Sequence, residues 1–94
     1  MANAMQLVVQ IQQKAVADLV AGKSQRPEIA ELIRDAREAG VVFEPMHPRA
    51  TDPESQSWFR ARAPEGADAR AIASRLLAHK SVLAAYPKPQ DEPP

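Results

Sequence analysis

The sequence contains no cysteine and few aromatic residues, and it carries no net charge of either sign. Without cysteine there is neither a disulfide framework nor a thiolate zinc site. The 12 lysine and arginine residues balance 12 aspartate and glutamate residues, and no block of one sign is long enough to follow a phosphate backbone. We therefore expect no nucleic-acid partner.

Long hydrophobic runs are also absent. No apolar run approaches the roughly 20 residues of a membrane span, and the N-terminus lacks a basic region followed by a long apolar segment. We expect a soluble chain without an export signal and without a membrane partner. Nothing in the composition indicates a compartment.

The hydrophobic core has to be built from small aliphatic side chains. Hydrophobic residues make up 45% of the 94 residues, but aromatic residues make up only 4%. A chain of this length holds one small domain with one core. We expect modest stability, which a bound partner would increase by mass action.

Apolar periodicity predicts the order strand, helix, strand, strand, helix, strand. A period of two predicts strands at residues 5–11, 41–43, 56–63 and 82–86. A helical period predicts helices at residues 27–39 and 67–79, the first with proline at its start and glycine after its end. Residues 14–25 form either an inserted turn or a separate short helix. Three prolines between residues 45 and 53 predict that residues 46–55 form a long exposed loop without helix or central strand.

This order is most economically folded as a ferredoxin-like βαββαβ arrangement of the α+β class, a four-stranded antiparallel sheet with two helices on one face. We expect residues 1–86 to form a single domain. Four of the nine prolines lie in residues 87–94, and proline disfavours helix both at its own position and at the preceding one. The last eight residues are therefore predicted to form an extended C-terminal arm.

The third predicted strand indicates which face of the sheet remains uncovered. Trp58, Arg60 and Arg62 alternate with apolar residues, and guanidinium groups beneath a helix layer would be buried without partners. These three side chains are therefore predicted to lie on the face without helices. Trp and Arg are enriched at the centres of protein interfaces. The alternative is a half-buried aromatic ring shielded by arginine side chains.

Residues with catalytic potential are few. His47 and His79 are the only histidines, and no second histidine or close carboxylate pair completes a metal site of plausible spacing. The serines lie in no nucleophile-elbow context, and three glycines are too few for a phosphate-binding loop. We expect no enzymatic activity, no catalytic residue, no metal and no cofactor.

A resemblance to a known family rests on three passages of the sequence: residues 6–11 (QLVVQI), residues 57–64 (SWFRARAP) and residues 71–86 (AIASRLLAHKSVLAAY). They resemble the strands and the final helix, turn and closing strand of the inhibitory propeptides of subtilisin-type serine proteases. The resemblance covers most of the chain. It implies that the uncovered sheet face docks on two surface helices of a protease, which is either part of the same precursor or a separate molecule.

The resemblance also implies site residues. The docking face would comprise Trp58, Arg60, Arg62, Leu83 and Ala85. The carboxylates of Asp52 and Glu54 would cap the two protease helices. The arm in the substrate cleft would comprise Tyr86, Pro87, Lys88, Pro89, Gln90, Asp91, Glu92, Pro93 and Pro94. The acidic residues near the end of the arm depart from clefts that favour apolar side chains.

Two functions from different classes follow from these patterns. The first is an inhibitor or folding chaperone of a subtilisin-type serine protease. The second is a small ferredoxin-like regulatory or interaction module that forms a homodimer through its sheet.

Overall fold

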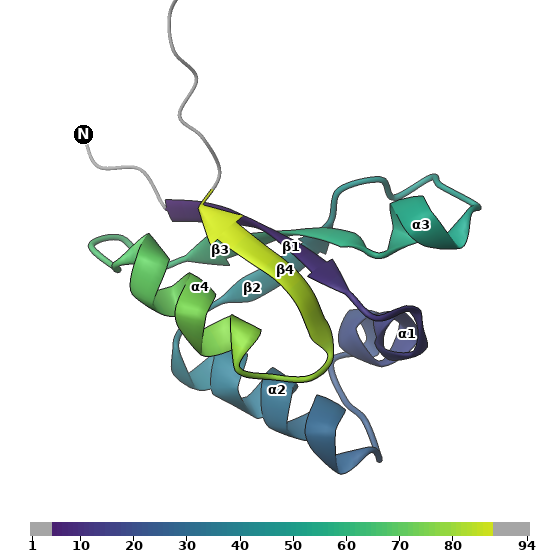
Figure 1. Ribbon diagram of the computed structural model, residues 1–94, viewed down its shortest axis with the longest axis horizontal. Helices are drawn as coiled ribbons and strands as arrows, with labels where there is room; N and C mark the ends of the chain where they lie inside the picture. The colour runs from purple at the N-terminus through teal and green to yellow at the C-terminus, as the bar shows by residue number, and fades with distance from the viewer. Residues whose placement is uncertain (1–4, 88–94) are drawn as a thin grey trace, which may run out of the picture.

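The computed structural model describes residues 5–87, whereas residues 1–4 and 88–94 lie outside the described part (Figure 1). Strands and helices follow one another in the order β1 (Met5–Ile11), α1 (Gln13–Ala21), α2 (Pro27–Glu38), β2 (Val42–Pro45), α3 (Pro53–Gln56), β3 (Trp58–Ala63), α4 (Ala69–Leu77) and β4 (Val82–Pro87). The four predicted strands and the two predicted helices are all present within a few residues of their expected ends.

The strands form one antiparallel sheet in the order β2-β3-β1-β4. The expectation of an α+β protein with a four-stranded antiparallel sheet is confirmed. β1 and β3 occupy the centre, while β2 and β4 are the two edges. The register places Val8 of β1 opposite both Arg60 of β3 and Tyr86 of β4, and it places Glu44 of β2 opposite Arg60.

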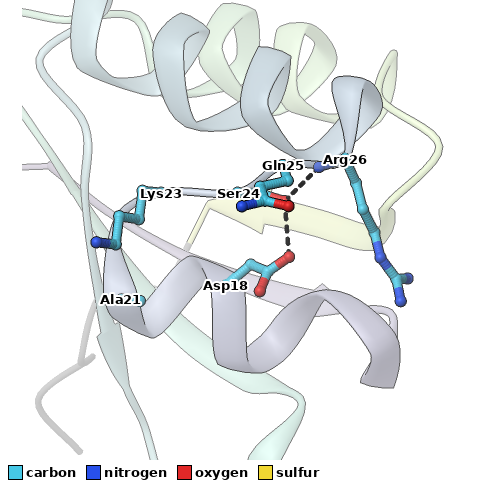
Figure 2. A pocket seen from close by; sticks show the side chains of 6 residues that line it. All are labelled: Asp18, Ala21, Lys23, Ser24, Gln25 and Arg26. Carbon is cyan, nitrogen blue, oxygen red and sulfur yellow. Dashed lines mark hydrogen bonds between the residues drawn. The ribbon is translucent and has the colours of Figure 1, made fainter.

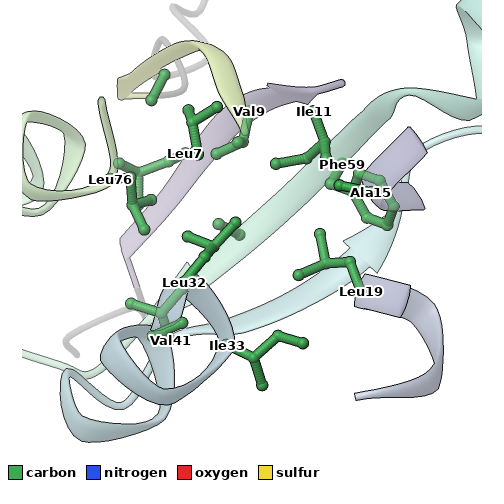
Figure 3. Packing of buried hydrophobic residues seen from close by; sticks show 14 of the residues in the cluster. Leu7, Val9, Ile11, Ala15, Leu19, Leu32, Ile33, Val41, Phe59 and Leu76 are labelled. Carbon is green, nitrogen blue, oxygen red and sulfur yellow. The ribbon is translucent and has the colours of Figure 1, made fainter. Parts of the chain in front are cut away.

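Helices α2 and α4 lie against the same face of the sheet (Figure 1). The core between these layers contains alternate residues of the strands and the inner residues of the helices (Figure 3). Its largest fully buried side chains are Leu7, Val9, Ile11, Ile29, Leu32, Phe59 and Leu76, together with the small Ser81. Phe59 meets Phe43 edge to face, with ring centroids 6.3 Å apart. No helix of the described chain covers the opposite face in Figure 1.

Two helices were predicted, but the described chain has four. α1 is separate from α2 because Gly22 ends it in the left-handed region, with φ of +77°, and the Gly22 N–H donates to the carbonyls of Asp18 and Leu19. Ala15 and Leu19 of α1 join the core, so this helix extends the helix layer. The segment that the sequence left open between a turn and a short helix is therefore a helix.

The prediction that residues 46–55 form a loop without helix or central strand is wrong at its C-terminal end, where α3 lies. Pro45 is the last residue of β2, an edge strand, where a missing N–H is tolerated. Pro53 is the first residue of α3, a position that proline also tolerates. The Asp52 carboxylate accepts a hydrogen bond from the Ser55 N–H at 2.9 Å and so caps this single turn.

Candidate functional site

The candidate site is the face of the sheet that carries no helix, here called the open face. Residues directly opposite each other in neighbouring strands share a face, and successive residues alternate between faces. The open face therefore comprises Gln6, Val8 and Gln10 of β1, Val42 and Glu44 of β2, Trp58, Arg60 and Arg62 of β3, and Ala84 and Tyr86 of β4. The structure places the three predicted residues of β3 on this face.

Strand β4 departs from the expected alternation. Gln10 lies opposite Ala84 and Ile11 lies opposite Val82, so Leu83 is an extra residue at a bulge. Leu83 is 54% exposed, whereas Ala85 lies opposite Val9 in the core and is 8% exposed. The prediction that Ala85 belongs to the open face is therefore wrong, because it assumed that Leu83 and Ala85 point the same way along a regular strand.

The ion pairs of the open face join two guanidinium groups to a single carboxylate. Glu44 lies between Arg60 and Arg62, with carboxylate-to-guanidinium distances of 3.8 Å and 3.4 Å. One carboxylate thus serves two cations. The Nε atom of Arg60 is buried and has no hydrogen-bond partner. An unpaired buried donor costs roughly 1–3 kcal/mol, so Arg60 is the least satisfied polar group of this face.

Apolar side chains on the sheet edges add to this surface. Val42 of β2 is 55% exposed and Tyr86 of β4 is 44% exposed, and Leu83 lies at the β4 bulge. Trp58 is half-buried, and the central Val8 is only 8% exposed although no helix covers it. Arg60 and Tyr86 lie opposite Val8 on the two neighbouring strands and account for its shielding. The open face thus combines a shielded apolar centre with exposed apolar edges.

Sequence reasoning missed Val8, Glu44 and Tyr86 as members of the open face. For Val8 and Glu44 a signal was available, because each alternates with buried or partly buried residues of its own strand. For Tyr86 the signal was misleading, since the bulge reverses the alternation within β4.

The two loop carboxylates lie away from the start of the arm. α3 precedes β3 at the end of the sheet where β1 finishes, as Figure 1 shows. Hydrogen bonds from the backbone and side chain of Ser55 lower the pKa of Asp52, which is the cap of its own helix. Glu54 is exposed on the same helix. Asp52 would have to share its carboxylate to cap a helix of another protein.

The predicted arm begins on an edge strand. Tyr86 and Pro87 are the last residues of β4, opposite Val8 and Leu7 of β1. Strand β4 has only one neighbour in the sheet, β1. The other seven residues of the predicted arm lie outside the described residues: Lys88, Pro89, Gln90, Asp91, Glu92, Pro93 and Pro94.

A polar hollow of about 600 Å³ lies at the turn between α1 and α2 (Figure 2). The Ser24 hydroxyl donates to Asp18 at 2.6 Å and accepts from the Arg26 N–H at 3.0 Å. Arg37 donates to the Gly22 carbonyl at 2.8 Å. These groups hold the turn together, so this hollow is explained by the connection between two helices.

An apolar hollow of about 530 Å³ lies between α1 and the loop after β2. Its walls include Val16, Val20, Pro45 and Pro48, and Phe59 contributes to its lining. His47, Gln13 and Gln56 are its polar residues. The lining contains no serine or carboxylate beside His47 that would form a catalytic pair.

The helix layer carries one charged cluster. Asp35 of α2 accepts hydrogen bonds from Arg75 Nε at 2.6 Å and from His79 Nε2 at 2.9 Å. These two bonds, from Arg75 first and His79 second, lower the pKa of Asp35. The cluster joins α2 to the end of α4. Within residues 5–87 no group of three His, Asp or Glu side chains could hold a metal ion.

No family model, curated protein or solved structure matches this chain. None of the helices described in residues 5–87 has the length and apolar character needed to cross a membrane.

Proposed function

We propose that this protein inhibits a subtilisin-type serine protease, or assists its folding, by docking its open face on the protease and placing its C-terminal arm in the substrate cleft. The observation that carries the proposal is the position of β4. This edge strand borders the open face and leads directly into the proline-rich arm. A docking face and an insertable peptide are therefore adjacent in one small domain.

The proposal includes a ferredoxin-like arrangement. The strand order β2-β3-β1-β4 supports it, because β3 separates β1 from β2 and β1 separates β3 from β4. The positions of α2 and α4 on one face support it as well. Helices α1 and α3 are then additions to the common βαββαβ pattern.

The size of the open face explains why an arm is needed. Four strands about 4.8 Å apart and six residues of about 3.4 Å give a footprint of roughly 300 Å². A stable interface buries about 800 Å² on each partner. The face alone would therefore bind weakly, and a second contact from the same chain is required for tight binding.

An arm of extended peptide supplies that contact. Its backbone groups form hydrogen bonds with an exposed strand edge of the protease, and its attachment to the docking face raises its effective concentration. Binding also stabilises the folded protease by mass action, because the inhibitor favours the folded form. Inhibition and assistance of folding would then have the same physical origin.

The test is peptide hydrolysis by a panel of subtilisin-type proteases with increasing amounts of this protein. We expect slowed hydrolysis, and we expect removal of residues 88–94 to weaken inhibition at least tenfold because it removes the linked contact. Removal of residues 1–4 is the matched control and should change little. Hydrolysis rates that stay unchanged across the panel contradict the proposal.

The docking face is tested separately by Trp58→Ala. We expect weaker inhibition by about tenfold, since large aromatic side chains at interface centres commonly contribute 1–2 kcal/mol or more. Val20→Ala on the outer side of α1 is the control, because Val20 is 62% exposed and belongs to the helix layer. Equal effects of the two substitutions contradict docking through the open face.

The alternative is a homodimer formed by two open faces. The observation that favours it is the presence of both charge signs on one face, where Glu44 of one copy can meet Arg60 of another across a two-fold axis. Sedimentation separates the two functions: a tight dimer that hides Trp58 favours self-association, and a monomer favours the inhibitor.

A further inference from the structure

We propose that the outer edge of β4 pairs with the same edge of a second copy of this chain, so that two four-stranded sheets join into one antiparallel sheet. This contact lies at the edge of the sheet and leaves both open faces uncovered. It therefore differs from a homodimer formed by two open faces, and it does not depend on the protease proposal.

The two edges of the sheet differ in their protection against pairing with another chain. Edge strands are commonly protected by shortness and by charged side chains. β2 has four residues and carries Glu44. β4 has six residues, none of them charged, with proline only at its last position. Its bulge lies near its start, and residues 84–87 continue in regular register with β1. Within the described residues no strand pairs with the outer side of β4, so its backbone groups on that side are available to a partner strand.

Exposed apolar side chains gather at the β4 edge. Five large hydrophobic side chains are exposed in the described chain, and three of them belong to α4 and β4: Leu77, Leu83 and Tyr86. Arg75 of α4 faces α2, because it donates to Asp35. Leu77 follows Arg75 by two residues, about 200° around the helix, so it faces away from α2. Because α4 packs chiefly on β4, this direction leads to the outer side of β4. The edge thus presents apolar side chains in the helix layer and in the sheet.

The composition of β4 fits a second copy of the same strand. In a two-fold antiparallel pairing, identical strands lie side by side, so a charged residue would come close to a like charge. β4 has no charged residue, and the net charge of zero for the whole chain removes long-range repulsion between copies. A pairing centred on Ala85 places Tyr86 of one copy opposite Ala84 of the other. Both lie on the open face, and the small alanine leaves room for the ring.

The size of this contact sets its strength. The six residues of β4 give an edge about 20 Å long, and sheet and helix layer together are about 15 Å thick, which gives roughly 300 Å² on each copy. A stable interface buries about 800 Å² on each partner. We therefore expect a reversible dimer with a dissociation constant of roughly 10 µM to 1 mM.

The test is sedimentation equilibrium of the full chain, without any protease, at concentrations from about 10 µM to about 1 mM. We expect Leu83→Lys to raise the dissociation constant at least tenfold, because it replaces an apolar contact by a cation on the strand edge. Leu83 is 54% exposed, so the substitution is compatible with the fold, which circular dichroism checks. The matched control is Val42→Lys, which adds the same charge at a 55% exposed position of β2. It should change the dissociation constant by less than about twofold.

NMR spectra of the unaltered chain give a second measurement. On dilution we expect the amide signals of residues 84–86 to shift, whereas those of residues 42–44 on the opposite edge stay unchanged. A chain that remains monomeric up to about 1 mM would overturn the proposal. So would equal effects of the two lysine substitutions, or dilution shifts at both edges, because the contact would then involve the open face. Failure of protease inhibition leaves this test unaffected, and the reverse also holds.

Discussion

Replacing Gly40 by alanine tests the close approach between the turn that joins α2 to β2 and Pro64, which follows β3. Gly40 has φ of +77°, a conformation that L residues rarely adopt, and an added Cβ would lie 2.7 Å from the Pro64 Cγ. The left-handed conformation alone costs about 1–2 kcal/mol. The contact with the stiff Pro64 ring adds roughly 1–2 kcal/mol, as overpacking commonly does.

We expect Gly40→Ala to lower the free energy of unfolding by about 3 kcal/mol in all. That is a large fraction of the roughly 5–14 kcal/mol expected for a chain of this length. Urea denaturation followed by circular dichroism measures the change, and an unchanged slope of the transition shows that the unfolded states are comparable.

Gly66 provides the matched control for this experiment. Its φ is +84°, but no atom lies within 4 Å of an added Cβ. Gly66→Ala should therefore cost only the conformational part, about 1–2 kcal/mol. Combining Gly40→Ala with Pro64→Ala should recover the contact part, because the ring atoms are removed. Equal losses for the two single glycine variants, with no recovery in the double variant, would refute the close approach of these two turns.

Three further predictions concern stability. Asp35→Asn should cost about 1 kcal/mol near pH 5, since it weakens the bonds to Arg75 and His79. Because the folded-state pKa of Asp35 is lowered, its contribution is complete above the unfolded pKa of about 3.9 and is lost as the pH falls through the folded value. The difference from the native chain in urea titrations should therefore shrink from pH 5 to pH 2; a constant difference contradicts the cluster. Leu32→Ala, at a fully buried position, should cost about 2–5 kcal/mol. Leu77→Ala, on a side chain that is 47% exposed, should cost less than about 1 kcal/mol in the same assay, and similar losses at both sites contradict the core described here.

The local sequence pattern was sufficient to predict several helices and strands. α2 was predicted almost to its last residue because Pro27, the charges at its ends and Gly40 all agree with one helix. The position of Trp58, Arg60 and Arg62 opposite the core also followed from the sequence, since a period of two admits only two assignments and one of them buries two arginines.

Other features depend on residues far apart in the chain, and no local pattern contains them. Asp35 meets Arg75 and His79 over separations of 40 and 44 residues, and the sequence indicated His79 only as a residue near a helix end. Glu44 shares Arg60 and Arg62 because β2 pairs with β3 in one particular register.

By itself, the sequence determined the order of the four strands and of helices α2 and α4, the α+β class and the side of the sheet on which the arginines of β3 lie. These features depend on periodicity within single segments. Only the tertiary structure decided that Ala85 belongs to the core, that Asp52 caps its own helix and that α1 joins the helix layer. The physical reason is that a bulge, a cap and a packing contact are set by the partner that a segment meets, and a partner's position is not encoded in the segment itself.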